Sequence, residues 1–233
     1  MSDLAHVNSW IFDLDNTLYP AECQLFAQID ARMTTFVERT LGLSYPDARK
    51  IQKDYYVQYG TTLSGLMNEH DVPPTDFMDY VHDIDVSGVA PCARLAANIE
   101  ALPGRRFVFT NGSVKHAENV LGQLGITSLF DGIFDIAAAG YVPKPNAHPY
   151  EAFVQAHNLD PARAIMFEDI AENLRVPETM GMRTVLVCSQ ARWIDDEPVA
   201  KRPAHPDDHF AHVHHKTTDL AGFLEDALQK MAS

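Results

Sequence analysis

The sequence predicts an α/β protein with a doubly wound, mostly parallel sheet and a helical segment inserted after the first strand. From residue 106 onward, short apolar runs of the kind that form buried strands alternate with stretches of helical periodicity. Such alternation is typical of a parallel sheet with helices on its faces. Another apolar run, Trp10 to Phe12, stands apart and is followed by about 80 residues with mostly helical patterns. The 233 residues suffice for a core domain and a smaller insert.

The first half of the chain contains the first strand and then helices. Apolar residues recur at helical spacing over 25–41, and Gly42 is a suitable end for that helix. Ser44, followed by Pro46, is typical of a helix start and predicts a second helix that reaches about residue 59. Further helices are predicted over 62–70, from residue 75 onward, and over 93–102.

The second half of the chain supplies the remaining strands and the helices between them. The predicted strands are 106–110, 133–138, 164–167 and 184–187, with a further strand suggested at 210–213. The predicted helices are 113–124, 150–157, 171–180 and an amphipathic helix over 220–231. Residues 195–208, rich in proline and charge, are expected to form a surface loop. We therefore expect a Rossmann-like core domain of residues 1–18 and 103–233 and a helical cap domain of residues 19–102.

Composition limits the class of protein and its partners. Hydrophobic residues make up 46% and charged residues 21% of the chain, as in ordinary soluble enzymes. The formal net charge of −14 argues against nucleic-acid polymers and membrane surfaces as partners, although local cations can still bind a phosphorylated small molecule. Sparse cysteines without a CxxC pair, no basic leader and no long apolar segment predict a cytoplasmic location. The oligomeric state stays open.

Two aspartates follow the first strand. Asp13 lies at the predicted carboxyl end of that strand, where open α/β sheets bind their ligands, and Asp15 follows two residues later. Two carboxylates so close repel each other unless a cation or a shared proton lies between them. The pair therefore indicates a metal-assisted site, although aspartates also end strands for purely structural reasons.

The next strand ends in a segment that suits a phosphate group. Thr110, Asn111 and Gly112 offer a hydroxyl, a side-chain amide and backbone N–H groups at the start of a helix. The alternative is an ordinary helix cap after a strand.

A lysine and a second pair of acids complete the pattern. Lys144 lies between two prolines, which stiffen the backbone that carries its charge, although such a lysine is also common in loops. Glu168 and Asp169 follow the strand 164–167 and add hard oxygen ligands to those of the first aspartates. So many carboxylates at one edge are tolerable around a divalent cation, and Mg²⁺ suits them best.

Histidines gather near the C-terminus in a way that suggests a zinc site. They are His205, His209, His212, His214 and His215. Their spacing matches no closed zinc site, so we expect a solvated segment instead.

Four motifs together resemble the haloacid dehalogenase-like hydrolase superfamily. They are D-L-D-N-T-L-Y (13–19), T-N-G (110–112), K-P (144–145) and F-E-D-I-A-E-N (167–173). The position of the insertion resembles the type-1 cap subclass. Within it, the first motif and Y-Y-V-Q-Y-G-T-T-L-S-G-L (55–66) resemble the pyrimidine 5′-nucleotidase branch. This resemblance implies hydrolysis of nucleoside monophosphates such as UMP and CMP.

The resemblance also implies a role for each site residue. Asp13 would be the nucleophile that forms an aspartyl-phosphate, and Asp15 the general acid and then base, which is chemically consistent with a two-step hydrolysis. Mg²⁺ would be held by Asp13, Asp169 and the backbone carbonyl of Asp15, with Glu168 holding a metal-bound water. Thr110, the Asn111 amide and Lys144 would hold the phosphoryl oxygens. Glu168 stands where many relatives carry Asp, which leaves open which acid contacts the metal.

The leaving group would be recognised by the cap. Tyr19, Tyr55, Tyr56 and Tyr59 offer rings that could stack on a base, and Thr61, Thr62 and Ser64 could bind base or ribose edges. The alternative is that these are core residues of amphipathic helices. Three other functions compete with nucleotidase activity. The first is hydrolysis of a carbon–halogen bond, which does not need Asp15. The second is action on another phosphoryl substrate, such as a sugar phosphate or phosphoglycolate, or a phosphomutase reaction, and the third is non-catalytic binding of a phosphorylated ligand or a protein.

Overall fold

The computed structural model describes residues 4–197 and 201–232. Within these residues a six-stranded sheet has the order β3-β2-β1-β4-β5-β6, and every neighbouring pair is parallel. The strands are β1 (Ser9–Phe12), β2 (Arg105–Phe109), β3 (Gly132–Phe134), β4 (Ala164–Glu168), β5 (Arg183–Val187) and β6 (His215–Thr217). The predicted α/β fold with a parallel, Rossmann-like sheet is confirmed.

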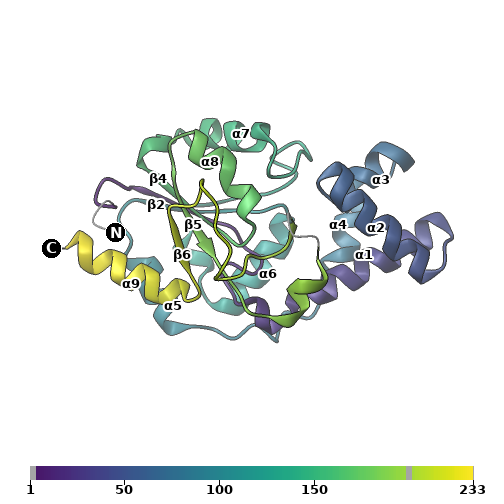
Figure 1. Ribbon diagram of the computed structural model, residues 1–233, viewed down its shortest axis with the longest axis horizontal. Coiled ribbons are helices and arrows are strands. Elements are labelled where there is room, and N and C mark those ends of the chain that lie inside the picture. Colours follow the sequence, from purple (N-terminus) through teal and green to yellow (C-terminus); the bar gives the residue numbers. More distant parts are fainter. Residues whose placement is uncertain (1–3, 198–200, 233) are drawn as a thin grey trace.

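Helices cover both faces of the sheet (Figure 1). They are α5 (Ala93–Ala101), α6 (Val114–Leu124), α7 (Ala147–His157), α8 (Arg175–Thr179) and α9 (Leu220–Met231). Alternate residues of β1 point to opposite faces. Trp10 and Phe12 pack with α5, α6 and α9, whereas Ile11 packs with α7 and the segment that leads into α8. The strand is buried along its whole length and lies between β2 and β4, so its carboxyl end lies near the middle of the sheet edge.

The inserted helices lie together on one side of the sheet core (Figure 1). They are α1 (Leu25–Leu41), α2 (Tyr45–Tyr59), α3 (Thr62–His70) and α4 (Pro74–Val81). They have a hydrophobic cluster of their own, which includes Ile29, Val37, Leu66 and Phe77. Ile136 joins this cluster from the loop after β3.

The local signals for helix ends act as predicted. The Ser44 side chain accepts a hydrogen bond from the backbone N–H of Asp47 at the start of α2. Gly42 ends α1 with a positive φ of 63°, a backbone conformation that glycine adopts without strain. Ser113 caps α6 in the same way as Ser44, by accepting from the N–H of His116.

Helix α5 packs differently from the rest of the insertion expected over 19–102. Its Leu95 and Ile99 belong to the hydrophobic cluster of the sheet. Arg94 bridges Asp219 at 2.9 Å and Glu225 at 2.7 Å, at the start and in the middle of α9. The packing groups α5 with the core and α1–α4 with one another, while the division into two domains stays a prediction.

Several predicted elements differ from the structure. Residues 210–213 are not a strand; the last strand among the described residues is β6, an edge strand whose side chains are partly buried or exposed and so need not be apolar. Residues 171–180 form a 3-10 turn and then the short α8 instead of one helix. The extended piece after residue 133 stops at Phe134, and α7 begins at Ala147, before the predicted start. Part of the predicted loop 195–208, residues 198–200, lies outside the described residues.

The histidines near the C-terminus are not a solvated group throughout. His212 is buried, and its Nε2 lies 2.7 Å from the carbonyl oxygen of Ala171. The Nδ1 of His214 lies 2.7 Å from the hydroxyl of Thr184 on β5. These two rings therefore join the last loop to the sheet core, which corrects the expectation for them.

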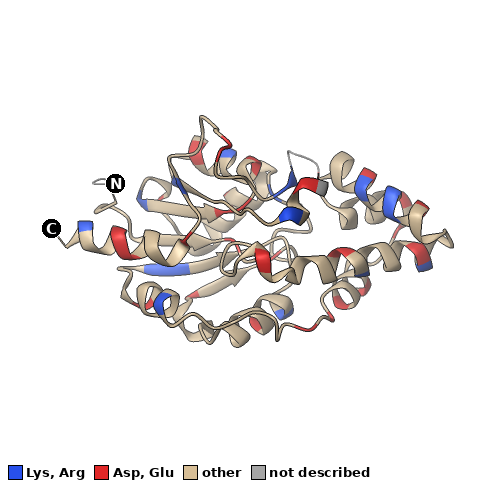
Figure 2. Cartoon of the chain, turned by 60° about the horizontal axis from the view of Figure 1, so that its bottom comes forward, with Lys and Arg blue, Asp and Glu red and all other residues tan. Residues whose placement is uncertain are grey.

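Charged residues are spread over the sheet core and the inserted helices alike, with acidic ones prominent on both (Figure 2). None of the described helices combines the length and the apolar composition that crossing a membrane requires.

Candidate active site

Three neighbouring strands end at one point and deliver most of the predicted site residues. In the register of the sheet, Phe12 of β1 lies opposite Val108 of β2 and Phe167 of β4. The residues that follow these positions therefore come together at the carboxyl edge of the sheet. Asp13, Thr110 and Asp169 are all less than 7% exposed there. The prediction that these strand ends converge is correct.

Lys144 reaches this edge from the loop before α7. Its Nζ donates hydrogen bonds to Asp13 Oδ1 at 2.7 Å, to Glu168 Oε1 at 2.6 Å and to the Phe109 carbonyl at 2.9 Å. All three donors of the ammonium group are thus used. Burial alone would lower the pKa of Lys144, but the negative charges of Asp13 and Glu168 raise it, so the side chain stays charged.

Glu168 is occupied by protein donors. Besides Lys144, the Asn173 side-chain amide donates to Oε1 at 2.7 Å, and the backbone N–H of Ile170 donates to Oε2 at 2.9 Å. The position of Asn173 is itself fixed, because its carbonyl oxygen accepts from the Tyr150 hydroxyl at 2.7 Å. In this arrangement Glu168 holds the lysine and the loop after β4 in place.

The Thr110 segment is shaped by its own hydrogen bonds. The Asn111 side chain accepts from the backbone N–H of Lys144 at 2.9 Å and so ties the lysine loop to the end of β2. Gly112 was expected to offer a free N–H, but that group donates to Thr110 Oγ1 at 2.9 Å. Thr110, Asn111 and Gly112 all line the pocket described below.

Asp13, Glu168 and Asp169 form a cluster of acids that could hold a metal ion, since one oxygen of each lies within 4.8 Å of the others. Burial raises the pKa of Asp13 to about 7, although Lys144 opposes the shift. Burial, together with the charges of Glu168 and Asp13, raises the pKa of Asp169 well above its usual range. Three carboxylates share one lysine, so the donor set fits a divalent cation with oxygen ligands. Asp13 and Asp169 are the better candidates for direct ligands, because protein donors occupy Glu168.

Asp15 lies in a different environment from Asp13. Its Oδ1 lies 2.8 Å from His116 Nε2 and accepts from the Tyr19 hydroxyl at 2.5 Å. Burial alone would raise the pKa of Asp15, but the charge and the hydrogen bond of His116 hold it below its usual range. Conversely, Asp15 outweighs burial and raises the pKa of His116. The two aspartates therefore have different partners although they are two residues apart.

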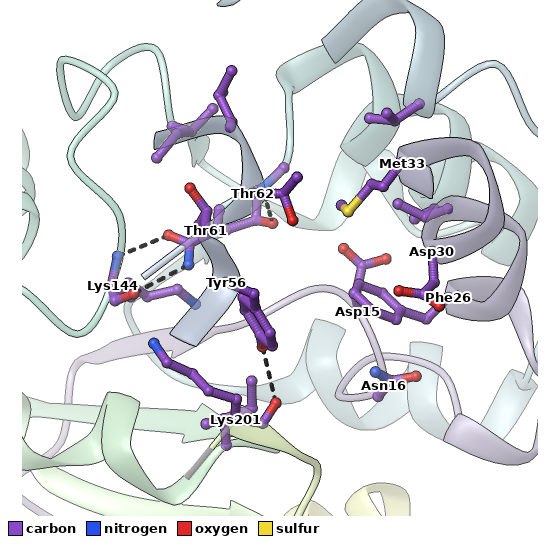
Figure 3. A pocket seen from close by; sticks show the side chains of 18 of the residues that line it. Asp15, Asn16, Phe26, Asp30, Met33, Tyr56, Thr61, Thr62, Lys144 and Lys201 are labelled. Atoms are coloured by element: carbon purple, nitrogen blue, oxygen red, sulfur yellow. Dashed lines mark hydrogen bonds between the residues drawn. The ribbon is translucent and has the colours of Figure 1, made fainter. Parts of the chain in front are cut away.

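A pocket lies between the strand ends and the inserted helices (Figure 3). Its helix side carries mainly apolar side chains from α1 and α4, namely Phe26, Ile29, Met33, Phe77, Met78 and Val81. The pocket is also lined by Asp15 and Asp30 (Figure 3).

The structure separates the tyrosines and threonines that were expected to bind substrate. Tyr56, Thr61 and Thr62 line the pocket. Tyr55 and Tyr59 do not, because they lie on another face of α2, where their hydroxyls bond to His70 and Glu69 of α3.

Tyr19 also does not face the pocket. It is 2% exposed, and its hydroxyl bonds to Asp15. For Tyr19, Tyr55 and Tyr59 the expectation of a substrate contact is therefore corrected.

Sequence reasoning missed several residues at this site. His82, at the end of α4, lies in the pocket wall and stacks on His116. Lys201 also lines the pocket; its ammonium group lies 3.5 Å from the Gly60 carbonyl and 5.4 Å from the centre of the Tyr56 ring. No sequence signal pointed to these residues. His82 reaches the site through the packing of α4 against the core, and Lys201 through the packing of its loop against the end of α2.

Comparison with known proteins places the chain in a family. Residues 9–181 match the family model of haloacid dehalogenase-like hydrolases. "Phosphate metabolism protein 8" of Saccharomyces cerevisiae is 27% identical over 94% of this chain and 70% of its own length.

Two solved structures share the fold of this chain, and their names state different activities. A HAD phosphatase from Thermococcus onnurineus has a TM-score of 0.63 at 14% identity, covering 95% of this chain and 98% of its own. An L-2-haloacid dehalogenase from Xanthobacter autotrophicus has a TM-score of 0.58 at 15% identity, with the same coverage. The fold alone does not separate the two activities. The chain belongs to the haloacid dehalogenase-like hydrolases.

Proposed function

We propose that the protein is a Mg²⁺-dependent phosphomonoester hydrolase that acts through an aspartyl-phosphate, with pyrimidine nucleoside 5′-monophosphates as its substrates. The observation that carries the proposal is the separation of Asp13 and Asp15. Both line the pocket, but Asp13 is paired with Lys144, whereas Asp15 is held by His116 and Tyr19. Hydrolysis of a phosphomonoester needs both a nucleophile and a second acid that cycles its proton. A carbon–halogen bond needs only the nucleophile, so Asp15 favours the phosphatase.

In this proposal Asp13 attacks phosphorus through the carboxylate oxygen that is not bound to Lys144. The three donors of Lys144 are bonded to the protein, so this residue contributes its positive charge beside the phosphoryl group. The Thr110 hydroxyl holds a phosphoryl oxygen, on which negative charge develops. Asp15 gives a proton to the leaving oxygen and later takes one from the water that opens the aspartyl-phosphate. A Mg²⁺ ion bound by Asp13, Asp169 and the Asp15 carbonyl would shield the anionic nucleophile from the anionic phosphate.

The apolar wall supports a nucleoside as the leaving group. A sugar phosphate or phosphoglycolate would bring hydroxyls or a carboxylate against Phe26, Met33 and Val81, where they would lose water without gaining partners. A pyrimidine ring has apolar faces that suit such a wall. Polar groups at Tyr56 and Thr62 lie at another part of the same pocket and suit the ribose or the edge of the base.

The test is a substrate screen with and without Mg²⁺. Initial rates are measured for UMP, CMP, glucose 6-phosphate, phosphoglycolate and 2-chloropropionate, in Mg²⁺ and in excess chelator. We expect UMP and CMP to be hydrolysed at least about tenfold more efficiently than the other esters, which corresponds to roughly 1.4 kcal/mol of discrimination. Equal rates on all the phosphate esters would exclude the nucleotidase but keep the phosphatase. Halide release without phosphate release would exclude both.

A further inference from the structure

The carboxyl group of Asp15 is held from one side only. Both of its hydrogen bonds, from Tyr19 and from His116, go to Oδ1. No described residue forms a hydrogen bond with Oδ2. A carboxyl group fixed in this way cannot turn freely about its last bond, so its two oxygens have different surroundings.

The His116 ring is itself held firmly. It is fully buried, and it stacks on the His82 ring with 4.4 Å between the ring centres and 8° between the planes. His82 Nδ1 lies 3.0 Å from the Ser113 hydroxyl, and that hydroxyl also accepts the backbone N–H of His116. Ser113 therefore fixes the His82 ring and the backbone of His116 at the start of α6. The His116 ring stacks on the fixed His82 ring, so Asp15 receives its hydrogen bond from a well-held donor.

The other nitrogen of the His116 ring contributes no hydrogen bond to the described part of the fold. Its Nδ1 is buried and has no hydrogen-bond partner in the part of the chain that the structure describes. A buried polar atom without a partner costs free energy, and an apolar side chain of similar size would avoid that cost. The imidazole thus provides one hydrogen bond, the one to Asp15, at the expense of stability.

We propose that His116, together with Tyr19, is a positioning residue that holds Oδ1 of Asp15 and so leaves Oδ2 to exchange the proton with the leaving group. This inference rests on the proposed function, in which Asp15 is the general acid. Neither His116 nor Tyr19 contacts the substrate in this arrangement.

Against the effect of burial, His116 holds the pKa of Asp15 below its usual range, so Asp15 is ionised in the free protein. It takes a proton on Oδ2 from the monoanionic form of the phosphomonoester as the ester binds. The bond from phosphorus to the leaving oxygen breaks while the bond from Asp13 to phosphorus forms. The electron pair of the broken bond stays on the leaving oxygen, which takes the proton from Asp15 Oδ2. Asp15 becomes a carboxylate, and the donors on Oδ1 stabilise its new charge. In the second step, the attacking water returns a proton to Oδ2.

The experiment compares two leaving groups in variants of His116. The kcat/KM value, which covers the steps up to departure of the leaving group, is measured for UMP, or for the alkyl phosphate that the screen finds best, and for p-nitrophenyl phosphate. The nucleoside alkoxide needs a proton to leave, whereas p-nitrophenolate leaves without one. For His116→Leu we expect kcat/KM to fall about 10- to 100-fold with the alkyl ester, a part of the usual contribution of a general acid, and less than about threefold with the aryl ester.

Matched variants separate positioning from a structural role. His116→Gln can place an amide N–H near Nε2 and should recover most of the lost activity on the alkyl ester. Tyr19→Phe should show the same leaving-group preference as His116→Leu and keeps the test valid if that variant does not fold. His214→Leu removes another imidazole hydrogen bond, the one to Thr184, and should leave both kcat/KM values unchanged.

Two outcomes would overturn the inference. Equal losses on the two esters in folded His116→Leu, or in Tyr19→Phe, would mean a structural role. No loss on either ester would mean no role. Asp15→Asn tests the underlying function separately: it should lose activity on the alkyl ester more strongly than any His116 variant. Full activity of Asp15→Asn would exclude Asp15 as the acid, whatever the His116 variants show.

Discussion

Two carboxylates on opposite sides of the pocket, Asp13 and Asp30, differ in how their charge is balanced. On the helix side, Asp30 accepts from Lys53 and Arg49, both at 2.8 Å, and from the Gln52 amide at 2.6 Å. Burial alone would raise the pKa of Asp30, but these cations hold it below its usual range. On the strand side, Asp13 shares the single Lys144 with Glu168, and its pKa is raised to about 7.

This difference shows which side of the pocket lacks positive charge. The charges on the helix side are balanced. Its two paired acids, Asp30 and Glu197, face two cations, because Arg49 and Lys53 pair with Asp30 and Lys53 also pairs with Glu197 at 2.6 Å. The strand side has three buried acids and one lysine. Low solvation makes such an excess of negative charge costly unless a cation binds. The strand side is therefore suited to a metal and a reacting phosphate, and the helix side to an uncharged leaving group.

The largest expected effect comes from removing the nucleophile on the strand side. Asp13→Asn should lower kcat by at least about 10⁴-fold, as loss of a covalent nucleophile does in other hydrolases. It should also abolish the acid-stable protein-bound phosphate that quenching and labelled substrate detect. Asp135→Asn is the control, because Asp135 also follows a strand but only accepts backbone N–H groups of Val114 and Ala138. A labelled intermediate in Asp13→Asn would contradict the covalent mechanism.

The next effect concerns the charge balance itself and its dependence on pH. Burial raises the pKa of Asp13 to about 7 in the folded chain, from the 3.8 that is usual for an aspartate in water. Between these values the folded chain binds more protons than the unfolded chain, so the metal-free protein should lose stability as the pH rises through this window. Added Mg²⁺ needs the ionised carboxylates and should reverse this loss.

Thermal unfolding curves between pH 5 and 8 measure this effect. At 100 times its dissociation constant, Mg²⁺ should contribute about 2.7 kcal/mol, and its effect on Tm should grow with pH. Asp30 provides the contrast, because its pKa is lowered in the folded chain. The stability that Asp30 contributes is present when the pH is above its pKa in the unfolded chain, and it is lost only as the pH falls. A Mg²⁺ shift in Tm that is independent of pH would show that the strand side is not short of positive charge.

The smallest effect is expected at the apolar wall. Phe26→Ala removes ring surface from the pocket wall and should lower kcat/KM for UMP by roughly fivefold to tenfold, about 1 kcal/mol, with little change for phosphoglycolate. Tyr55→Phe is the matched control on α2, outside the pocket, and should change neither value. Equal losses on both esters would show that the wall does not select the leaving group.

Much of the strand side could be predicted from sequence because its chemistry is local to strand ends. Asp13, Thr110 and Asp169 each follow an apolar run directly, and parallel pairing brings such ends together whatever the remaining packing. The helix side could not be predicted in the same way. Tyr55 and Tyr56 are adjacent in sequence, and only the rotation of α2 against its neighbours decided that Tyr56 faces the pocket and Tyr55 faces α3.

The sequence by itself determined the sheet, the edge at which ligands bind and the two aspartates that follow β1. The tertiary structure alone decided what holds Asp15. Tyr19 is four residues away and His116 is 101 residues away, and both reach the same oxygen. His82 reaches His116 from the end of α4. Contacts between distant residues depend on how whole helices pack, which no local pattern of residues specifies, whereas a strand end is defined by the few residues that precede it.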